Sequence, residues 1–467
     1  MKSDKQGLNL KREVGIVGAV SFIAGTIIGS GIFVSPQFVL SAIGSPGASF
    51  IVWACSGLIS MLAGLCYAEI GTVIPESGGE FIYILRTAGK VVAFTFVFSY
   101  IVIVRPASAT GLALSFAEYV VAPFYGCTPP QLMVKLVAAV AMMVLAIINC
   151  LSVRLTTAIQ VVSMVVKMLA LAVIVLGGVV MLFQGHTENF ENSFEGTNVG
   201  VSSIGIAFYQ GLWSYDGWNT LNYVTEELKH PEVNLPRAIV IAISTVTGLY
   251  LLVNVSYLTV LTPRELMSSS AVAVTWGNKV LGNWGWIMSV AAALSAFGSL
   301  NGTFFSGGRV CFVAAREGQL PDILAMAHVH RLTPAPALIF TTFISLLVLI
   351  PGDFQSIVNY FSFTAWFFYA VTLCGLLYLK IKKPELPRPY RVPIIIPILV
   401  IIVAIFLVLA PIIDKPQIEY LYVTLFILSG AILYIPFIHY KLCTGLLTKL
   451  TVFLQLFLEV APADKNL

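Results

Sequence analysis

The sequence predicts an all-α membrane protein with twelve transmembrane helices, and its composition, its hydropathy and its charge distribution all indicate this class. Of the 467 residues, 58% are hydrophobic and 10% are charged. A soluble domain carries about 25% charged residues, so this chain has too few charges to cover a soluble surface. The composition excludes a soluble enzyme, a disordered scaffold and a secreted disulfide framework. A net charge of +4 without a basic stripe also excludes a nucleic-acid binder.

Twelve apolar segments are long enough to form helices across a bilayer, which takes about 20 residues. The strand alternation of an outer-membrane barrel is absent from the sequence. The predicted spans are residues 14–42, 48–72, 89–119, 131–150, 158–184, 201–222, 238–261, 279–308, 334–352, 354–378, 392–412 and 419–441. A polar tail, residues 1–13, precedes them. The segment 442–467 follows them and repeats leucine and phenylalanine at helical spacing, which predicts a cytoplasmic amphipathic helix.

The distribution of basic residues predicts that both termini are cytoplasmic. If the N-terminus lies inside, the outer segments hold only three of the 26 Lys and Arg residues, namely Arg264, Lys279 and Lys415. Three others lie within spans or at their edges, and all the rest are on inner segments. Membrane proteins carry their excess of Lys and Arg on cytoplasmic loops, so this orientation follows. The outer loop at 185–200 fits it, because the loop is acidic and has no Lys or Arg.

Of the seven cysteines, only Cys127 lies in a predicted outer segment. The others lie in spans or on the cytoplasmic side, where thiols stay reduced. An outer cysteine without a partner in the chain indicates either a disulfide to another protein or a free thiol. The count of cysteines leaves both interpretations open.

Glycines interrupt the first and the sixth spans, in the stretches 25–33 and 211–219. Many secondary transporters pair discontinuous helices at matching positions of two inverted repeats, and these two stretches are five spans apart. Unwound backbone offers N–H groups that suit a carboxylate and carbonyl groups that suit an ammonium. An α-amino acid carries both groups on one carbon, so the two breaks predict an amino-acid site. The alternative for Gly25 and Gly29 is close helix packing of the GxxxG type.

Three ionisable residues lie inside spans, where a charge is costly and marks a functional site by default. Asp216 lies in the second break and would attract the positive side chain of lysine, arginine or ornithine. Its alternative role is that of a structural partner for Arg105 or for a backbone N–H. Lys167 would act as a fixed cation where a sodium-coupled protein holds a metal ion, or it reaches to the inner surface as a snorkelling lysine. Arg105 precedes Pro106 in irregular backbone, so a structural role is as good an interpretation as a substrate role.

The sequence contains no catalytic or metal-binding constellation. The motifs GxxxxGK[ST], GxSxG and HExxH are absent, which argues against a nucleotide-driven pump and an intramembrane hydrolase. His328 and His330 have no third ligand beside them. We therefore expect no enzymatic activity, no cofactor and no metal site.

Six short motifs lie along the chain: GTIIGSGIFVSP at 25–36, CYAEIG at 66–71, SGG at 77–79, TEE at 225–227, REG at 316–318 and LTP at 332–334. Together they resemble the L-type amino-acid transporter light chains of the amino acid–polyamine–organocation superfamily, over about residues 13–462. Within that family, WSYDGWN at 213–219 is most similar to the b(0,+) type, because other members typically carry Gly, Ser or Asn at the position of Asp216. The segments 185–196 and 361–366 look like the same type.

The resemblance implies a LeuT-type fold with broken helices 1 and 6. Spans 1–5 (residues 14–184) and spans 6–10 (201–378) would form inverted repeats, and 392–441 would hold the last two spans. It implies sodium-independent, one-for-one exchange, in which Ser30 and Gly31 hold the substrate carboxylate and the carbonyls of Ile27 and Trp213 hold the α-ammonium. Trp213 would also act as the gate over the substrate. The expected substrate contacts are Thr26, Ile27, Ser30, Gly31, Trp213, Ser214, Asp216 and Asn219.

The resemblance also assigns partners. Lys167 matches the family lysine that stands in for sodium. Cys127 matches the cysteine that forms a disulfide with a single-span glycoprotein heavy chain, which for the b(0,+) type is rBAT. It implies a plasma-membrane location, in the apical membrane of epithelia, and allows a dimer of heterodimers.

Three departures keep alternatives open. Arg105 stands where the b(0,+) type usually has lysine, the tail reads Val460-Ala461-Pro462 in place of Val-Pro-Pro, and the last thirty residues also resemble the aspartate/glutamate light chain. Our hypothesis is an exchanger that takes up cationic amino acids and cystine for neutral ones. Its rivals are an exchanger of neutral or acidic amino acids only and, from another class, a non-transporting sensor or a channel.

Overall fold

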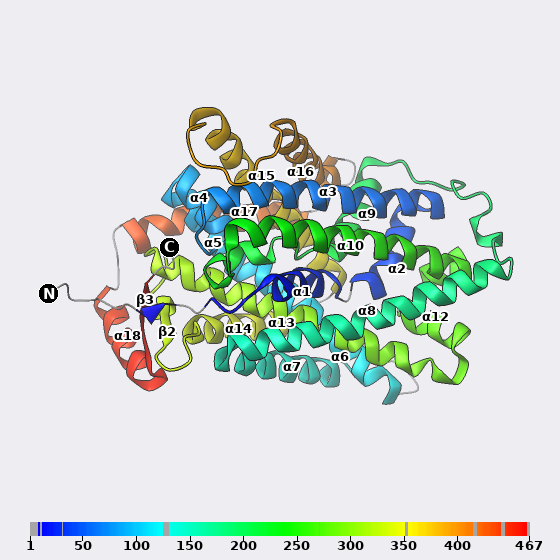
Figure 1. Ribbon diagram of the computed structural model, residues 1–467, viewed down its shortest axis with the longest axis horizontal. Coiled ribbons are helices and arrows are strands. Elements are labelled where there is room, and N and C mark those ends of the chain that lie inside the picture. The colour runs from blue at the N-terminus through cyan, green and yellow to red at the C-terminus, as the bar shows by residue number, and fades with distance from the viewer. Residues whose placement is uncertain are drawn as a thin grey trace.

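The structure is a computed structural model and describes residues 8–9, 12–29, 31–124, 130–269, 271–350, 354–413, 418–439 and 444–464. Long helices run side by side along the molecule (Figure 1). Helix α18 and a small sheet lie at one end of it, and α12 lies at the other.

The first half of the chain, as described, holds three long uninterrupted helices, α3, α7 and α8, and several that are bent or joined. Its elements are β1 (Leu8–Asn9), α1 (Ile16–Ile27), α2 (Gly31–Ile43), α3 (Pro46–Val73), α4 (Glu80–Ala88), α5 (Lys90–Ser99), the π-helical turn η1 (Tyr100–Val104), α6 (Arg105–Val121), η2 (Ala122–Phe124), α7 (Gln131–Leu151), α8 (Val153–Phe183) and η3 (Glu188–Phe190).

The second half begins with a helix that ends early. Its elements are α9 (Val201–Ser214), η4 (Thr220–Tyr223), η5 (Thr225–Glu227), α10 (Pro231–Val260), α11 (Pro263–Ser268), α12 (Val272–Val280), η6 (Gly282–Trp284), α13 (Trp286–Arg316), η7 (Asp322–Ala325), β2 (Met326–His328), α14 (Ala335–Leu349), α15 (Phe354–Lys382), α16 (Ile395–Ile413), α17 (Ile418–Tyr434), η8 (Ile435–His439), α18 (Thr444–Leu458) and β3 (Val460–Asp464).

The helices confirm an all-α membrane protein. Within the described ranges, eight helical segments are long and apolar enough to cross a membrane, and the bent pair α1–α2 makes a ninth. Helices α14, α17 and α18 are apolar but shorter. Every predicted span overlaps a helix, while the number twelve stays a prediction.

The span predicted at 201–222 is α-helical as far as Ser214, in agreement with the break predicted at 211–219. One predicted boundary was wrong in an informative way. The span predicted at 279–308 is a helix from Trp286 to Arg316. The helix continues past the predicted end, where Arg309 and Arg316 are both neutralised by buried carboxylates.

Helix α13 is the most enclosed of the long helices. In its most apolar stretch 78% of the residues are buried, whereas in that of α8 only 28% are. It packs against α1, α6 and α8. Gly302 makes the approach to α1 possible, because a Cβ atom there would lie 1.9 Å from Thr26 Oγ1. The helices α1, α8, α10 and α13 therefore surround the first break.

The small sheet joins parts of the chain that are far apart in sequence. Strand β3 pairs in parallel with β1, with Leu8 opposite Ala463, and antiparallel with β2, with His328 opposite Val460. The predicted C-terminal amphipathic helix exists as α18, but the strand after it was not predicted.

Candidate functional site

The first break leaves the last carbonyl groups of α1 without helical partners, and side chains from other helices take their place. Helix α1 ends at Ile27 and α2 begins at Gly31, with a bend of 40° between them. The Ser299 hydroxyl donates to the Thr26 carbonyl at 2.5 Å. The Ser295 hydroxyl donates to the Ile28 carbonyl at 3.1 Å. The orphan carbonyls that a helix end creates are thus satisfied within the protein.

Lys167 supplies the strongest of these contacts. Its Nζ atom donates to the carbonyl oxygens of Gly25 at 2.6 Å and Ile28 at 2.7 Å, and it lies 3.4 Å from that of Ser295. The side chain is fully buried. An ammonium at the C-terminal end of a helix faces the negative end of the helix dipole. The snorkelling alternative does not describe this geometry.

The second break touches the first. The Tyr250 hydroxyl lies 2.9 Å from the Ile27 carbonyl oxygen and 2.7 Å from that of Ser214, the last residue of α9. Glycine is needed where the two backbones meet: a Cβ atom on Gly31 would lie 2.7 Å from Ser214 Cα. Gly217 has a φ of +109°, a left-handed conformation that glycine adopts without strain.

A cavity of about 10 Å³, room for about one water molecule, lies between the two breaks. Five of the expected substrate contacts line it, namely Thr26, Ile27, Gly31, Trp213 and Asp216. The Thr26 hydroxyl has no hydrogen-bond partner among the described residues. Trp213 packs edge-on against Phe361, with ring centroids 5.1 Å apart.

Two other predicted contacts, Ser214 and Asn219, lie outside the cavity lining. Ser214 packs beneath Gly31, outside the cavity lining. Asn219 points away from the cavity and donates to Glu80 Oε1 at 2.6 Å. Ser30 and Cys127 lie outside the described residues.

Asp216 stands between this cavity and a second one of about 10 Å³, which it also lines. Its carboxylate accepts a long hydrogen bond of 3.4 Å from the Tyr369 hydroxyl. Arg105 lines the second cavity too, but within the described part of the chain no ion pair joins it to Asp216. Of the two predicted structural roles, an ion pair with Arg105 is not found, whereas a backbone hydrogen bond from Gly217 to the carboxylate is.

Arg105 is held by aromatic rings. Its guanidinium lies 4.7 Å from the ring centre of Tyr100 and 5.6 Å from that of Tyr223. It follows the π-helical turn η1, which forms where Pro106 cannot donate a helical hydrogen bond. Such turns often occur at functional sites.

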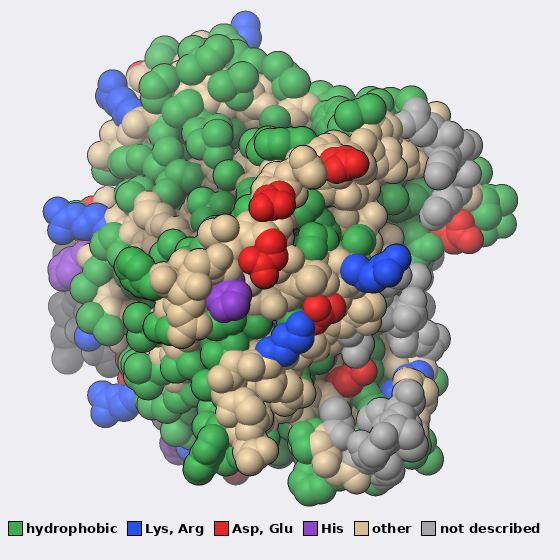
Figure 2. All heavy atoms as spheres, turned by 90° about the vertical axis from the view of Figure 1, so that its right-hand side faces the viewer, with side chains coloured by type: hydrophobic (Ala, Val, Ile, Leu, Met, Phe, Trp, Pro, Cys, Tyr) green, Lys and Arg blue, Asp and Glu red, His purple; other side chains and the backbone are tan. Residues whose placement is uncertain are grey.

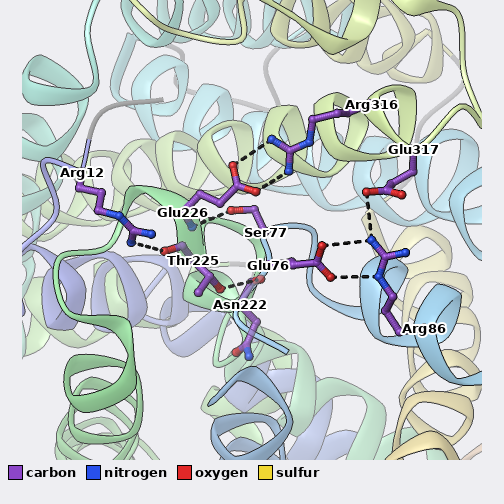
Figure 3. Close-up of polar contacts among 9 residues, drawn as sticks. All are labelled: Arg12, Glu76, Ser77, Arg86, Asn222, Thr225, Glu226, Arg316 and Glu317. Atoms are coloured by element: carbon purple, nitrogen blue, oxygen red, sulfur yellow. Dashed lines mark hydrogen bonds and ion pairs between the residues drawn. The ribbon is translucent and has the colours of Figure 1, made fainter. Parts of the chain in front are cut away.

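Buried ion pairs close the molecule on the side of the sheet and α18. Arg316 forms a bidentate pair with Glu226, whose backbone N–H donates to Ser77 Oγ at 2.7 Å (Figure 3). Arg309 pairs with Glu227 at 2.7 and 2.9 Å. The sequence analysis missed these pairs. The available signal was the spacing of the two arginines, which puts them on one face of a helix opposite an acidic doublet.

The N-terminal segment runs beneath these pairs. Arg12 Nη1 donates to the Leu228 carbonyl at 2.8 Å, and Val14 forms a backbone bridge with Leu228. Nearby, Arg86 binds both oxygens of Glu76 at 3.0 Å and Glu317 at 3.2 Å (Figure 3). These contacts connect the N-terminal segment to the residue that follows η5, and α4 to the residue that follows α13.

No group of three His, Cys, Asp or Glu side chains that could hold a metal ion occurs within the described ranges. The opposite end of the molecule, which carries α12, shows a band of carboxylates across its middle, with Lys and Arg side chains among them (Figure 2).

Comparison with known proteins identifies relatives over almost the whole chain. A family described as amino acid permease matches residues 14–437. The human b(0,+)-type amino acid transporter 1 is 48% identical over 461 residues, which cover 98% of this chain and 95% of the relative, and the mouse protein of that name gives the same values. The rabbit large neutral amino acids transporter small subunit 2 is 43% identical over 416 residues, or 88% of this chain and 77% of the relative.

Proposed function

We propose that this chain, which belongs to the amino acid permease family, is the light chain of an exchanger that takes up cationic amino acids and cystine in return for neutral amino acids, without sodium. Its relatives are named as amino-acid transporters, so it is a transporter and not an enzyme. The choice of substrate, the coupling and the partner are the proposal.

One observation carries the proposed substrate class: Asp216 is a carboxylate in the break of α9, at a cavity, without an ion-pair partner among the described residues. A charge in a membrane interior is expensive unless it has a function or a partner. A substrate with a cationic side chain supplies the missing partner. Its α-carboxylate would meet the backbone at Gly31, and its ammonium the carbonyls of Ile27 and Trp213.

The position of Lys167 supports sodium independence. Its ammonium already contacts three carbonyl oxygens at the end of α1 and on α13, which is the kind of oxygen cluster that would otherwise suit a cation. A fixed positive charge that comes with the chain removes the need for one from solution.

The packing of the helices supports a repeat of five spans. Helices α1, α6, α7 and α8 of the first five spans correspond to α9, α13, α14 and α15 of the next five. Helix α1 packs on α8, and the corresponding helices α9 and α15 also pack on each other. The same holds for α6 with α7 and α13 with α14, and for α8 with α13 and α15 with α6. Exchanging the first five spans with the next five turns each of these pairs into another pair that exists, as two inverted repeats require.

Alternating access would follow from movement of α1, α3, α9 and α10 against the rest. The cavity at Asp216 is too small for an amino acid in this arrangement, and the ion pairs of Glu226 and Glu227 close the path on one side. Release on that side requires these pairs to separate. A membrane potential that is negative inside would favour uptake of a cation by about 2.3 kcal/mol per charge per 100 mV.

The relatives named as a small subunit support a second chain in the transporter. We place the proposed disulfide to an rBAT-like heavy chain at Cys127. The location would be the plasma membrane, with both termini and the sheet inside and the carboxylate band of Figure 2 outside.

Arg105 favours a second candidate. Its buried guanidinium lines the cavity behind Asp216 and forms no ion pair in the described part of the chain, so it would suit an acidic substrate side chain. This candidate is an exchanger of neutral and acidic amino acids.

Exchange in proteoliposomes that contain the chain and an rBAT-type heavy chain distinguishes these functions. The vesicles are loaded with radiolabelled arginine in sodium-free buffer, and efflux is followed with leucine, aspartate or nothing outside. We expect efflux with leucine alone. Efflux into plain buffer would indicate a channel or uniporter. No efflux of arginine, together with leucine-driven efflux from vesicles loaded with radiolabelled aspartate, would support the acidic exchanger.

A further inference from the structure

The cavity behind Asp216 holds a second carboxylate. It lies between α4, η1, α6, η4 and α15, and its charged lining residues are Glu80, Arg105 and Asp216. Aromatic rings make up most of the remaining wall. Because Asp216 lines this cavity and also the one between the breaks, a substrate side chain that passes Asp216 enters here.

Glu80 is buried and only half satisfied. Its side chain is 1% exposed. Oε1 accepts from Asn219 Nδ2 at 2.6 Å and from the Tyr67 hydroxyl at 3.1 Å. Oε2 has no hydrogen-bond partner among the residues that the structure describes. A buried carboxylate oxygen without a donor is costly and rare, so it requires an explanation.

Arg105 does not provide that explanation. No ion pair within 4.0 Å joins it to Glu80 in the described part of the chain, and its guanidinium lies against Tyr100 and Tyr223. Its Nε atom is itself without a hydrogen-bond partner. When all three groups are ionised, the two carboxylates and the one guanidinium give the cavity a net charge of about −1. One cationic side chain would neutralise it.

Asp216 lines both cavities and Glu80 only the second, so a side chain that enters from the first cavity meets Asp216 before Glu80, and this order distinguishes long from short cationic side chains. A guanidinium has five N–H donors in a planar fork, so it can bind one carboxylate with each edge. An ammonium on a short side chain reaches the nearer carboxylate only. A leucine side chain needs neither.

We propose that Glu80 is a specificity-determining residue, whose free oxygen binds the far edge of a long cationic side chain while Asp216 binds the near edge. Glu80 thereby sets the preference for arginine over short diamino acids. This inference rests on the proposed function, in which Asp216 receives the cationic side chain.

The test measures the apparent KM of external substrates in exchange by the chain with its heavy chain in proteoliposomes. The substrates are arginine, 2,4-diaminobutyrate and leucine. Glu80→Gln keeps an acceptor for Asn219 and Tyr67 but removes the charge. We expect the KM for arginine to rise about tenfold, while those for diaminobutyrate and leucine stay within about twofold. Glu118→Gln, on the outer end of α6, is the matched control and should change none of them.

A second variant guards against a merely structural effect. Glu80→Asp retracts the carboxylate by one methylene, so it should weaken arginine and restore tight exchange for the longer homologue homoarginine. Equal losses for all three substrates in Glu80→Gln, without recovery by homoarginine in Glu80→Asp, would make Glu80 structural. An unchanged KM for arginine would overturn the inference.

The same assay separates this inference from the proposed function. Asp216→Asn should weaken arginine and diaminobutyrate alike, because both need the near carboxylate. If it does so while Glu80→Gln has no effect, only the inference about Glu80 fails. If Asp216→Asn weakens neither cation relative to leucine, the proposed function fails.

Discussion

The ion pairs of Arg309 and Arg316 lie at the end of the molecule near the sheet and α18, which we call the mouth. The buried charges there and those beside the two cavities differ in how they are paired. At the mouth, Glu226 and Glu227 each form an ion pair with an arginine of α13. Beside the cavities, Asp216 accepts hydrogen bonds from Tyr369 and the Gly217 backbone, and one oxygen of Glu80 has no hydrogen-bond partner among the described residues. Ion pairs hold one arrangement of the helices, whereas a buried carboxylate without an ion pair in the described part of the chain can receive a cationic ligand.

The largest effect should come from breaking a pair at the mouth. Arg309→Met would leave Glu227 buried without a partner, which costs about 3–5 kcal/mol. We expect a large fall in the melting temperature of the purified transporter, and recovery of most of it in the double variant with Glu227→Gln. Arg86→Met, in a pair where the arginine side chain is 37% exposed, is the control and should change it little. A fall no larger than that of the control would show that the pair does not hold the structure.

The next effect concerns Lys167, whose hydrogen bonds in the described part of the chain go to backbone carbonyls. Lys167→Met would leave the carbonyls of Gly25 and Ile28 without these donors, at about 1–3 kcal/mol for each buried group left unsatisfied. We expect exchange to fall by more than about tenfold at saturating substrate, measured in proteoliposomes.

Lys135 offers a matched control, since it also donates to a carbonyl, that of Ile350, at 2.5 Å, but the contact is exposed. Lys135→Met should exchange normally. Similar rates for the two variants would remove Lys167 from the mechanism.

The smallest effect should come from an exposed pair at the opposite end. A hydrogen bond from Lys279 lowers the pKa of Glu265 below its usual range. The pair therefore contributes stability above the unfolded pKa and loses it as the pH falls through the lower folded pKa. Glu265→Gln should lower the melting temperature slightly at neutral pH, and the difference from wild type should vanish in acid or at high salt. A difference that grows as the pH falls would contradict this.

The sequence predicted those parts of the site that carry a local signal. Glycine patterns revealed both breaks, and charges in apolar runs revealed Asp216 and Lys167. It could not predict Tyr250, Ser295 or Ser299, because a hydroxyl in a helix has no distinctive spacing. Their roles depend on which carbonyl the fold brings near, as with Ser299 and Thr26, 273 residues apart.

The sequence likewise did not show which charged residues outside the spans are buried, as Glu80 illustrates. It lies outside the predicted spans, in a short helix after α3, so nothing in the sequence indicated that it is buried. Conversely, the predicted span ended before the arginines of α13, whose neutralising partners lie about 80 to 90 residues away in the chain.

The central claim is that Asp216, which has no ion-pair partner in the described part of the chain, receives the cationic side chain of the substrate. Its most direct test is the apparent KM of Asp216→Asn for arginine and for leucine. The measurement uses the exchange assay with the heavy chain, in sodium-free buffer. We predict that the KM for arginine rises about tenfold or more, while that for leucine stays within about twofold. Equal losses for the two substrates would contradict the claim and make Asp216 a structural residue.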